Sequence, residues 1–201
     1  MAQKIIWKKF HQWKKNSDPL KARVTIFEQI RDIPYYLVEQ VDDPYEWAAL
    51  ILEKKQGSCA PKHYLLGLLF SMLGLQVKYT TYHFRWSEQK LQYPEALKKI
   101  VHDLPVGYHA ACKTFLAERW VLLDATWDSA LSKASFPVNL NWNGLSDTIN
   151  AVMPFEEVTH DTLQERLNYI REKKSLYTLT EKNAYLQFMG KFNLWLEKLR
   201  S

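Results

Sequence analysis

The sequence predicts an α+β fold in which N-terminal helices pack on a small antiparallel sheet and further helices close the chain. Three observations support this. Apolar residues recur with a helical period in the first part of the chain, alternate with a period of two in segments between residues 75 and 127, and return to a helical period near the end. Helices that are segregated from a sheet of consecutive strands are typical of the α+β class.

The composition is that of a globular protein. The chain has 201 residues, 47% hydrophobic and 24% charged, which excludes a disordered or collagen-like chain. No internal repeat or Gly/Ser linker divides it, so we expect a single domain over residues 1–201.

Two cysteines make no disulfide framework, which favours a reducing compartment. The longest apolar run, Tyr64–Leu75, is too short to span a bilayer, and the first residues lack a secretory signal. We therefore expect a soluble, cytoplasmic protein with no transmembrane segment.

The first sixteen residues are rich in lysine and predict an amphipathic helix. Ile6, Phe10 and Trp13 fall at i, i+4 and i+7 and form one apolar stripe backed by lysines. We expect this helix to dock on its own domain, with the basic side in solvent. A weak contact of the Lys-rich N-terminus with an anionic surface, lipid or nucleic acid, is the alternative partner. The oligomeric state is not indicated.

Proline and glycine delimit two helices after this one. Leu20–Arg31 has apolar residues at helical spacing and ends before Pro34. The next helix begins at Asp43, which can cap it, and Pro44 suits its first turn. It runs to Lys55, and Gly57 is expected to stop it.

A further helix begins near residues 58–61, because Pro61 is tolerated only in the first turn of a helix. It continues through a run of leucines, and Gly74 ends it. Gly67 lies in its middle, where glycine costs about 1 kcal/mol relative to alanine. We expect the backbone to approach a sheet closely at this point.

The segments with a period of two predict three strands. The first covers residues 75–81, and Gly107–Leu116 and Trp120–Trp127 form a hairpin that turns at Ala117–Arg119. Ser87–Pro105 is polar, has a short helical piece around residues 95–101, and is expected to be an insertion. Residues 128–154 are expected to be irregular. Two helices close the chain, the first built on Leu163, Leu167 and Ile170 and the second on Tyr185, Phe188, Phe192, Trp195 and Leu199.

Cys59 is the candidate nucleophile. A Gly-Ser-Cys turn places it at the N-terminus of an apolar helix. The helix dipole and the free backbone N–H groups there stabilise an anion, so they lower the pKa of a thiol. The same N–H groups can hold the oxyanion that develops during attack on a carbonyl.

The predicted hairpin brings a base and its orienting partner together. If the hairpin loop is centred between Ala117 and Glu118, Asp124 pairs with residue 111, because paired positions then sum to 235. His109 has the same parity as 111, so His109 and Asp124 share a face as diagonal neighbours. A thiolate over that face completes a Cys–His–Asp relay.

Three linked motifs occur in the order Cys, His, Asp. Gly57-Ser-Cys59 opens a helix that ends in Met-Leu-Gly74-Leu-Gln-Val, Tyr108-His109-Ala110 follows, and Trp120-Val-Leu-Leu-Asp124-Ala-Thr126 comes last. Together they resemble the transglutaminase-like family of the papain-like Cys-His-Asp superfamily. The resemblance implies a papain-like/transglutaminase-like core over about residues 30–130, with helical extensions at both ends. It also implies that Cys59 is the nucleophile, His109 the general base and then acid, and Asp124 its orienter.

Two positions depart from that family's pattern. Ala111 stands where an aromatic residue often lies, and Ala125 stands where a proline often follows the aspartate. A catalytically inactive transglutaminase-like binding module is therefore the alternative to an enzyme. The sequence does not place the second oxyanion donor; Tyr45, Trp47 and Gln56 are candidates.

Several neighbouring residues have a structural interpretation. Cys112 has the opposite parity to His109, so we expect it in the core. A zinc site of Cys59, His63, His109 and Cys112 is a rival to the triad. Because positions i and i+3 on a strand point to opposite faces, His109 and Cys112 cannot easily bind one ion, so we assign no metal.

Lys62, His63, His83 and His102 are expected on the surface. Trp86, Trp127 and Trp142 are expected in the core, with a lining role in a substrate cleft as the alternative.

These expectations converge on a cysteine-dependent acyl-transfer enzyme, an amide or peptide hydrolase or an amine acyltransferase. It would act through a thioester acyl-enzyme on a peptide or other amide-bearing substrate, and no cofactor is assigned. Water access to the thioester decides between hydrolysis and amine transfer, and the sequence does not show it.

Overall fold

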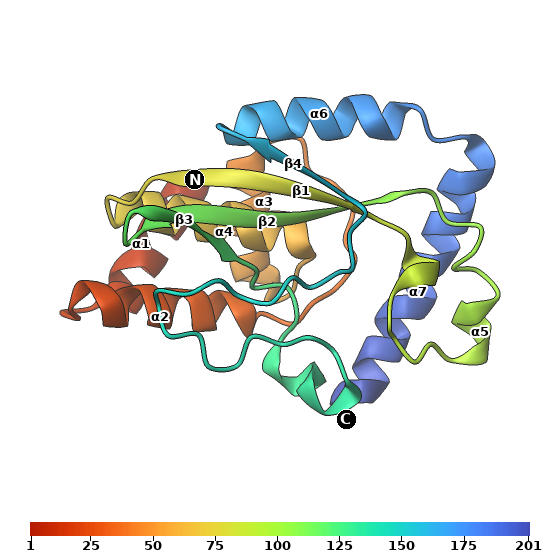
Figure 1. The fold of residues 1–201 in the computed structure, drawn as a ribbon, viewed down its shortest axis with the longest axis horizontal. Coiled ribbons are helices and arrows are strands. Elements are labelled where there is room, and N and C mark those ends of the chain that lie inside the picture. The colour runs from red at the N-terminus through yellow and green to blue at the C-terminus, as the bar shows by residue number, and fades with distance from the viewer.

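The computed structural model describes residues 1–201 as helices arranged around one antiparallel sheet (Figure 1). The sheet has four strands in the order β3-β2-β1-β4, and every neighbouring pair is antiparallel. The strands are β1 (Val77–Phe84), β2 (Gly107–Leu116), β3 (Arg119–Leu123) and β4 (Glu156–His160). Helices segregated from this sheet make the fold α+β, as predicted.

Four helices precede the sheet: α1 (Ala2–Lys14), α2 (Pro19–Arg31), α3 (Pro44–Lys54) and α4 (Cys59–Met72). The short α5 (Glu95–Lys98) lies between β1 and β2, and α6 (Leu163–Ser175) and α7 (Leu179–Arg200) end the chain. Two 3₁₀ helices, η1 (Trp86–Glu88) and η2 (Ser129–Ala134), lie in the connections. In Figure 1, α6 runs along β4, whereas α7 stands beside the sheet near α5. No helix combines the length and the apolar sequence that crossing a bilayer requires.

Side-chain caps determine where several helices begin. The Asp43 carboxylate accepts hydrogen bonds from the N–H groups of Tyr45 and Glu46, at 2.8 and 2.9 Å, and Pro44 occupies the first turn. The C-terminus of α3 differs from the expectation, because Lys55 rather than Gly57 adopts the left-handed conformation, with φ of 53°.

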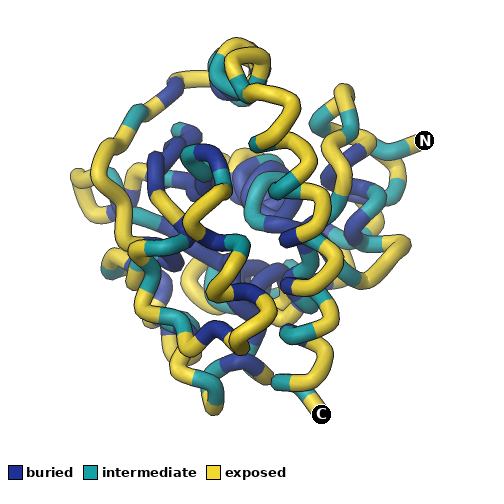
Figure 2. Tube along the Cα trace, turned by 90° about the vertical axis from the view of Figure 1, so that its right-hand side faces the viewer, coloured by how far each residue is buried: buried dark blue, intermediate teal, exposed yellow.

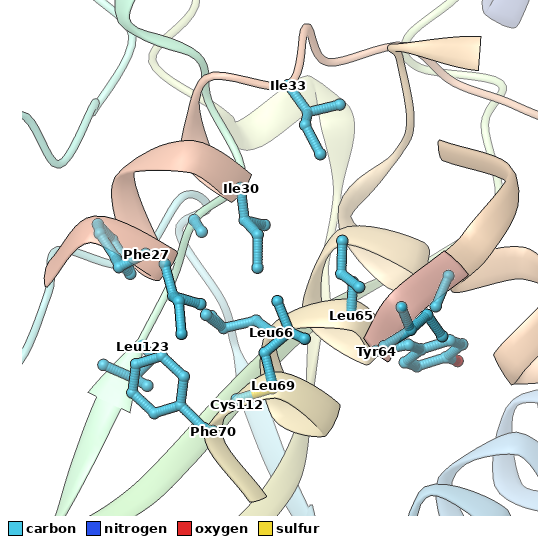
Figure 3. Close-up of a cluster of buried hydrophobic side chains, with 14 of the residues drawn as sticks. Phe27, Ile30, Ile33, Tyr64, Leu65, Leu66, Leu69, Phe70, Cys112 and Leu123 are labelled. Atoms are coloured by element: carbon cyan, nitrogen blue, oxygen red, sulfur yellow. The ribbon is translucent and has the colours of Figure 1, made fainter. Parts of the chain in front are cut away.

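The helix α4 is the centre of the first core. It packs on β1 and β2 and contacts α2 and α3, so it is covered on most sides. Figure 3 shows side chains of α2 and α4 meeting Cys112 of β2 and Leu123 of β3. The predicted close approach at Gly67 is confirmed, since a Cβ atom there would lie 2.6 Å from the Tyr79 hydroxyl on β1.

A second core lies around α7. Phe188 and Phe192 of this helix pack on Trp86 and other aromatic rings.

The helix α1 docks on the first core through Ile6, Phe10 and Trp13, as expected. Figure 2 shows buried residues gathered toward the middle of the trace and exposed residues around its outside.

The β2–β3 hairpin has the register on which the site prediction depends. Leu116 pairs with Arg119, so Ala117 and Glu118 form a two-residue loop, and both have positive φ, 46° and 60°. The strand β3 ends at Leu123, earlier than expected, because the backbone N–H groups of Asp124 and Ala125 donate to the side chains of Thr148 and His63 instead of continuing the ladder with β2.

The structure also corrects the prediction at β4 and at His83. The strand β4 was not expected; it pairs with β1 as a short polar edge strand and lacks the apolar alternation of the others. His83 is buried instead of lying on the surface, since its ring is held between the Glu156 carboxylate, at 2.8 Å, and the Tyr169 hydroxyl, at 2.7 Å. His102 is exposed, as expected.

Candidate active site

Cys59 is the first residue of α4, and the preceding chain holds it against residues 34–36. The N–H of Gly57 donates to the Pro34 carbonyl, and the N–H of Tyr36 donates to the Gly57 carbonyl, both at 3.1 Å. Cys59 is half-buried. As part of the first turn, its N–H and that of Ala60 have no partner within the helix, so they are available to an oxyanion.

His109 and Asp124 meet across the hairpin, as the register predicts. His109 Nε2 lies 2.7 Å from Asp124 Oδ2, and both residues are buried. Since Nε2 is committed to the carboxylate, Nδ1 is the ring nitrogen left to face the thiol. The backbone N–H of Ala110, next to His109, also helps to lower the pKa of Cys59.

The Cys59 thiol, the His109 imidazole and the Asp124 carboxylate together favour an ion pair between the thiol and the imidazole. Burial opposes the thiolate, but the charge and hydrogen bond of His109 outweigh it and lower the pKa of Cys59. Burial also opposes the imidazolium, but the Asp124 carboxylate and the Cys59 thiolate raise the pKa of His109 to about 10. The arrangement therefore favours an ion pair in which Cys59 is the thiolate and His109 the imidazolium.

The Asp124 carboxylate is held in place by more than His109. Its Oδ2 accepts the N–H of Ala151 at 2.8 Å, and its Oδ1 accepts the N–H of Thr126 at 3.1 Å. Burial disfavours its charge, but His109, followed by His63 and a hydrogen bond from Thr126, keeps the pKa of Asp124 below its ordinary value. Ala151 belongs to the irregular segment before β4, which the sequence did not connect with the site.

His63 is a structural member of the site and not a surface residue. Its Nδ1 lies 2.8 Å from the Cys59 carbonyl oxygen, and its Nε2 accepts the N–H of Ala125 at 2.9 Å. This pattern requires a neutral ring with the proton on Nδ1. Burial lowers the pKa of His63 to about 3, which agrees with that neutral form. His63 thus ties the start of α4 to the chain beside Asp124.

Lys62 is also buried, contrary to the expectation of a surface position. Its Nζ donates to the carbonyls of Arg31, Ile33 and Thr126 at 2.9, 2.8 and 2.7 Å. Burial lowers the pKa of Lys62 to about 7. Its position near the start of α4 brings it between two stretches of chain, residues 31–33 and the chain at Thr126, whose buried carbonyls need a hydrogen-bond donor.

Tyr35 is the site residue that sequence reasoning missed. It is buried, and it lines the same cavity as Cys59. Burial, followed by the negative charge at Cys59, raises the pKa of Tyr35, so it stays a hydrogen-bond donor. Of the candidates for a second oxyanion donor, Trp47 lines the same cavity, but Tyr45 and Gln56 do not.

The site opens into a cavity of about 460 Å³. Its walls come from residues 35–40, the start of α4, the start of β2, and the corner where α6 meets α7. Trp86 and Trp127 line it and are buried as well, whereas Trp142 packs on Phe27 and Phe70 in the first core. A cavity of this size is typical of a small-ligand site.

The rival zinc site would need Cys112, whose thiol is bonded elsewhere. Cys112 is buried in the first core, and its thiol donates to the His63 carbonyl at 3.0 Å. The structure holds no group of three or more His, Cys, Asp or Glu side chains arranged for a metal ion.

Comparison with known proteins adds little. No protein-family model matches this chain, and no curated protein matches it. One solved structure, described as "a Putative Cysteine Protease from Cytophaga hutchinsonii", is 16% identical in sequence, with a TM-score of 0.42 over 79% of this chain and 48% of its own. This chain therefore spans about half of that protein's length. Because a likeness at this level carries no argument about function, the case for function depends on the geometry of the site.

Proposed function

We propose that this chain is a cysteine-dependent acyl-transfer enzyme with a transglutaminase-like, papain-like core. The observation that carries the proposal is that Cys59 and His109 line one cavity, with Asp124 bonded to the far side of the imidazole and the pKa of the thiol lowered by that imidazole. Thiolate nucleophiles in such ion pairs attack amide and ester carbonyls.

The first half-reaction acylates the thiolate. The Cys59 sulfur forms a bond to the carbonyl carbon, and the negative charge moves to the carbonyl oxygen. His109, as imidazolium, then donates its proton to the leaving amine or alcohol, and the bond to that leaving group breaks. The product is a thioester, and His109 is left neutral.

The second half-reaction returns the thiolate. Neutral His109 accepts a proton from water or an amine as that nucleophile attacks the thioester carbon, and the sulfur leaves with its electron pair. Asp124 keeps Nε2 of His109 protonated throughout, so Nδ1 is the nitrogen that exchanges the proton.

Two groups are positioned to stabilise the oxyanion. One is the pair of backbone N–H groups of Cys59 and Ala60 at the start of α4, and the other is the Tyr35 hydroxyl. Because Tyr35 and Cys59 line the same cavity, the Tyr35 O–H is the side-chain donor for the carbonyl oxygen when the new bond to the sulfur forms.

Alkylation and acyl-enzyme trapping test the proposal. Iodoacetamide should label Cys59 with a midpoint well below about pH 8.5, the value for a free thiol, and His109→Ala should raise that midpoint. The Cys59→Ala variant is the matched control: it retains Cys112, whose pKa burial raises, and should not be labelled in the folded protein. Mass spectrometry after mixing with 4-nitrophenyl esters should show one acyl group on Cys59.

Ordinary titration of Cys59, together with no acyl-enzyme from any ester or peptide anilide, would overturn the enzyme proposal. The chain would then be the inactive binding module that the departures at Ala111 and Ala125 leave open.

A further inference from the structure

The cavity beside Cys59 has a chemical character that acyl transfer by itself does not require. Sixteen of its 25 lining residues are hydrophobic, and aromatic rings such as Phe84, Trp86 and Trp127 form much of the wall. Such a surface favours an apolar, preferably aromatic, part of a ligand.

Two lysines interrupt this apolar lining at the corner between α6 and α7. Lys174 is half-buried near the end of α6, and Lys182 is exposed near the start of α7. Neither forms an ion pair within the protein. Lys174 donates one hydrogen bond of 3.3 Å to the Gln40 side chain. Glu39, the acidic residue in the lining, is exposed and also unpaired.

A buried arginine at the other end of α6, outside the cavity lining, also carries a positive charge. Arg166 of α6 is 1% exposed, and it has no carboxylate partner. Its Nη1 donates to the Tyr64 hydroxyl at 2.5 Å, while its Nε has no partner. Burial, reinforced by the charge of Arg166, lowers the pKa of Lys174, and the charge of Cys59 acts in the opposite direction. A negatively charged ligand group at Lys174 would relieve this imbalance.

We propose, resting on the acyl-transfer function, that the substrate is a carboxylate-bearing compound whose apolar, aromatic part fills this cavity and whose carboxylate pairs with Lys174. Cys59 and Lys174 line the same cavity, so one molecule can present its carbonyl to the thiolate and its anionic group to the lysine. The carboxylate restores the charge partner that Lys174 lacks, and the aromatic lining supplies the contact area.

Binding to the Cys59→Ala protein tests this proposal without any chemistry. The probes are phenylhexanoate and its neutral amide, which differ only in charge, titrated by calorimetry. We expect the carboxylate to bind about tenfold more tightly than the amide, the effect of one hydrogen bond to a charged group. Adding Lys174→Met should reduce that preference to less than about threefold. Adding Lys173→Met should preserve it, since this neighbour on α6 does not line the cavity.

Equal affinity for the two probes, no binding of either at millimolar concentration, or a preference that survives Lys174→Met would overturn the inference. Such a result leaves the proposed function intact if the wild-type protein still forms an acyl-enzyme with neutral esters. Conversely, a Lys174-dependent preference in a protein that forms no acyl-enzyme supports the binding site and contradicts the reaction.

Discussion

Among the single residues, His63 shows how burial couples protonation to folding. Burial lowers the pKa of His63 to about 3, while a histidine in the unfolded chain titrates at about 6.5. Between these values the unfolded chain binds a proton that the folded protein does not. The stability that the neutral ring contributes is therefore complete above about pH 6.5 and is lost as the pH falls toward 3.

We expect His63→Gln to flatten the pH dependence of stability. Between about pH 5 and 6.5 the slope of the unfolding free energy should fall by up to about 1.4 kcal/mol per pH unit, the effect of one proton. His160, whose pKa burial also lowers, keeps part of the slope. Urea titrations at several pH values measure the slope. His102→Gln changes an exposed ring and should leave it unaltered, and an unaltered slope in His63→Gln would contradict the assignment.

Tyr35 offers a prediction that distinguishes two roles of its hydroxyl, as a donor to the oxyanion and as a partner of the Cys59 thiolate. If its hydroxyl binds the oxyanion, Tyr35→Phe should lower kcat by about 100-fold, the usual effect of removing one such donor. The alkylation midpoint of Cys59 should move by less than about half a pH unit, because His109 remains the dominant cause of the lowered pKa. A shifted midpoint with kcat unchanged would instead make Tyr35 a partner of the thiolate alone.

At the scale of elements, two helical glycines have opposite surroundings. A Cβ on Gly67 of α4 would meet the buried Tyr79 ring at 2.6–2.9 Å, whereas a Cβ on Gly190 of α7 would meet nothing within 4 Å. Close packing of α4 on Tyr79 therefore requires glycine at position 67, whereas no neighbour requires glycine at position 190.

We therefore expect alanine to have opposite effects at these positions. Gly67→Ala should destabilise the protein by about 1–3 kcal/mol, because overpacking outweighs the better helix propensity. Gly190→Ala should stabilise it by up to about 1 kcal/mol, because only the propensity changes. Chemical denaturation of both variants beside the wild type gives the two signs, and a stabilising Gly67→Ala would show that the sheet yields to α4.

Element prediction from the sequence succeeded where strong local signals existed. Asp43-Pro44, Pro61 and Gly74 marked helix ends, and Gly107–Leu116 was placed with its observed bounds because its alternation is long. The strand β4 was missed, since five polar-rich residues at an edge gain their conformation from pairing with β1. The hairpin register followed from counting, although Ala117 and Glu118 are not typical residues for a loop with two positive φ values.

On the scale of the whole molecule, the candidate site combines segments that the sequence keeps far apart. Cys59, His109 and Asp124 were predicted because their motifs are local and their register countable. Tyr35 and the cavity wall at the α6–α7 corner were not, because their places depend on packing between distant elements. Lys62 and His63 were expected on the surface, since nothing in their immediate sequence shows that α4 is covered on that side.

Lys62 gives the prediction that belongs to this scale, because it joins the end of α2, the segment leading to Tyr35 and the chain after β3. Lys62→Met keeps the length of the side chain but leaves three carbonyls without their donor, so we expect a loss of about 3–5 kcal/mol in unfolding free energy. Lys99→Met, on an exposed lysine, should stay within about 0.5 kcal/mol of the wild type. If Lys62→Met instead unfolds at the urea concentration of the wild type, these segments are held together by apolar packing, and the buried ammonium serves another purpose.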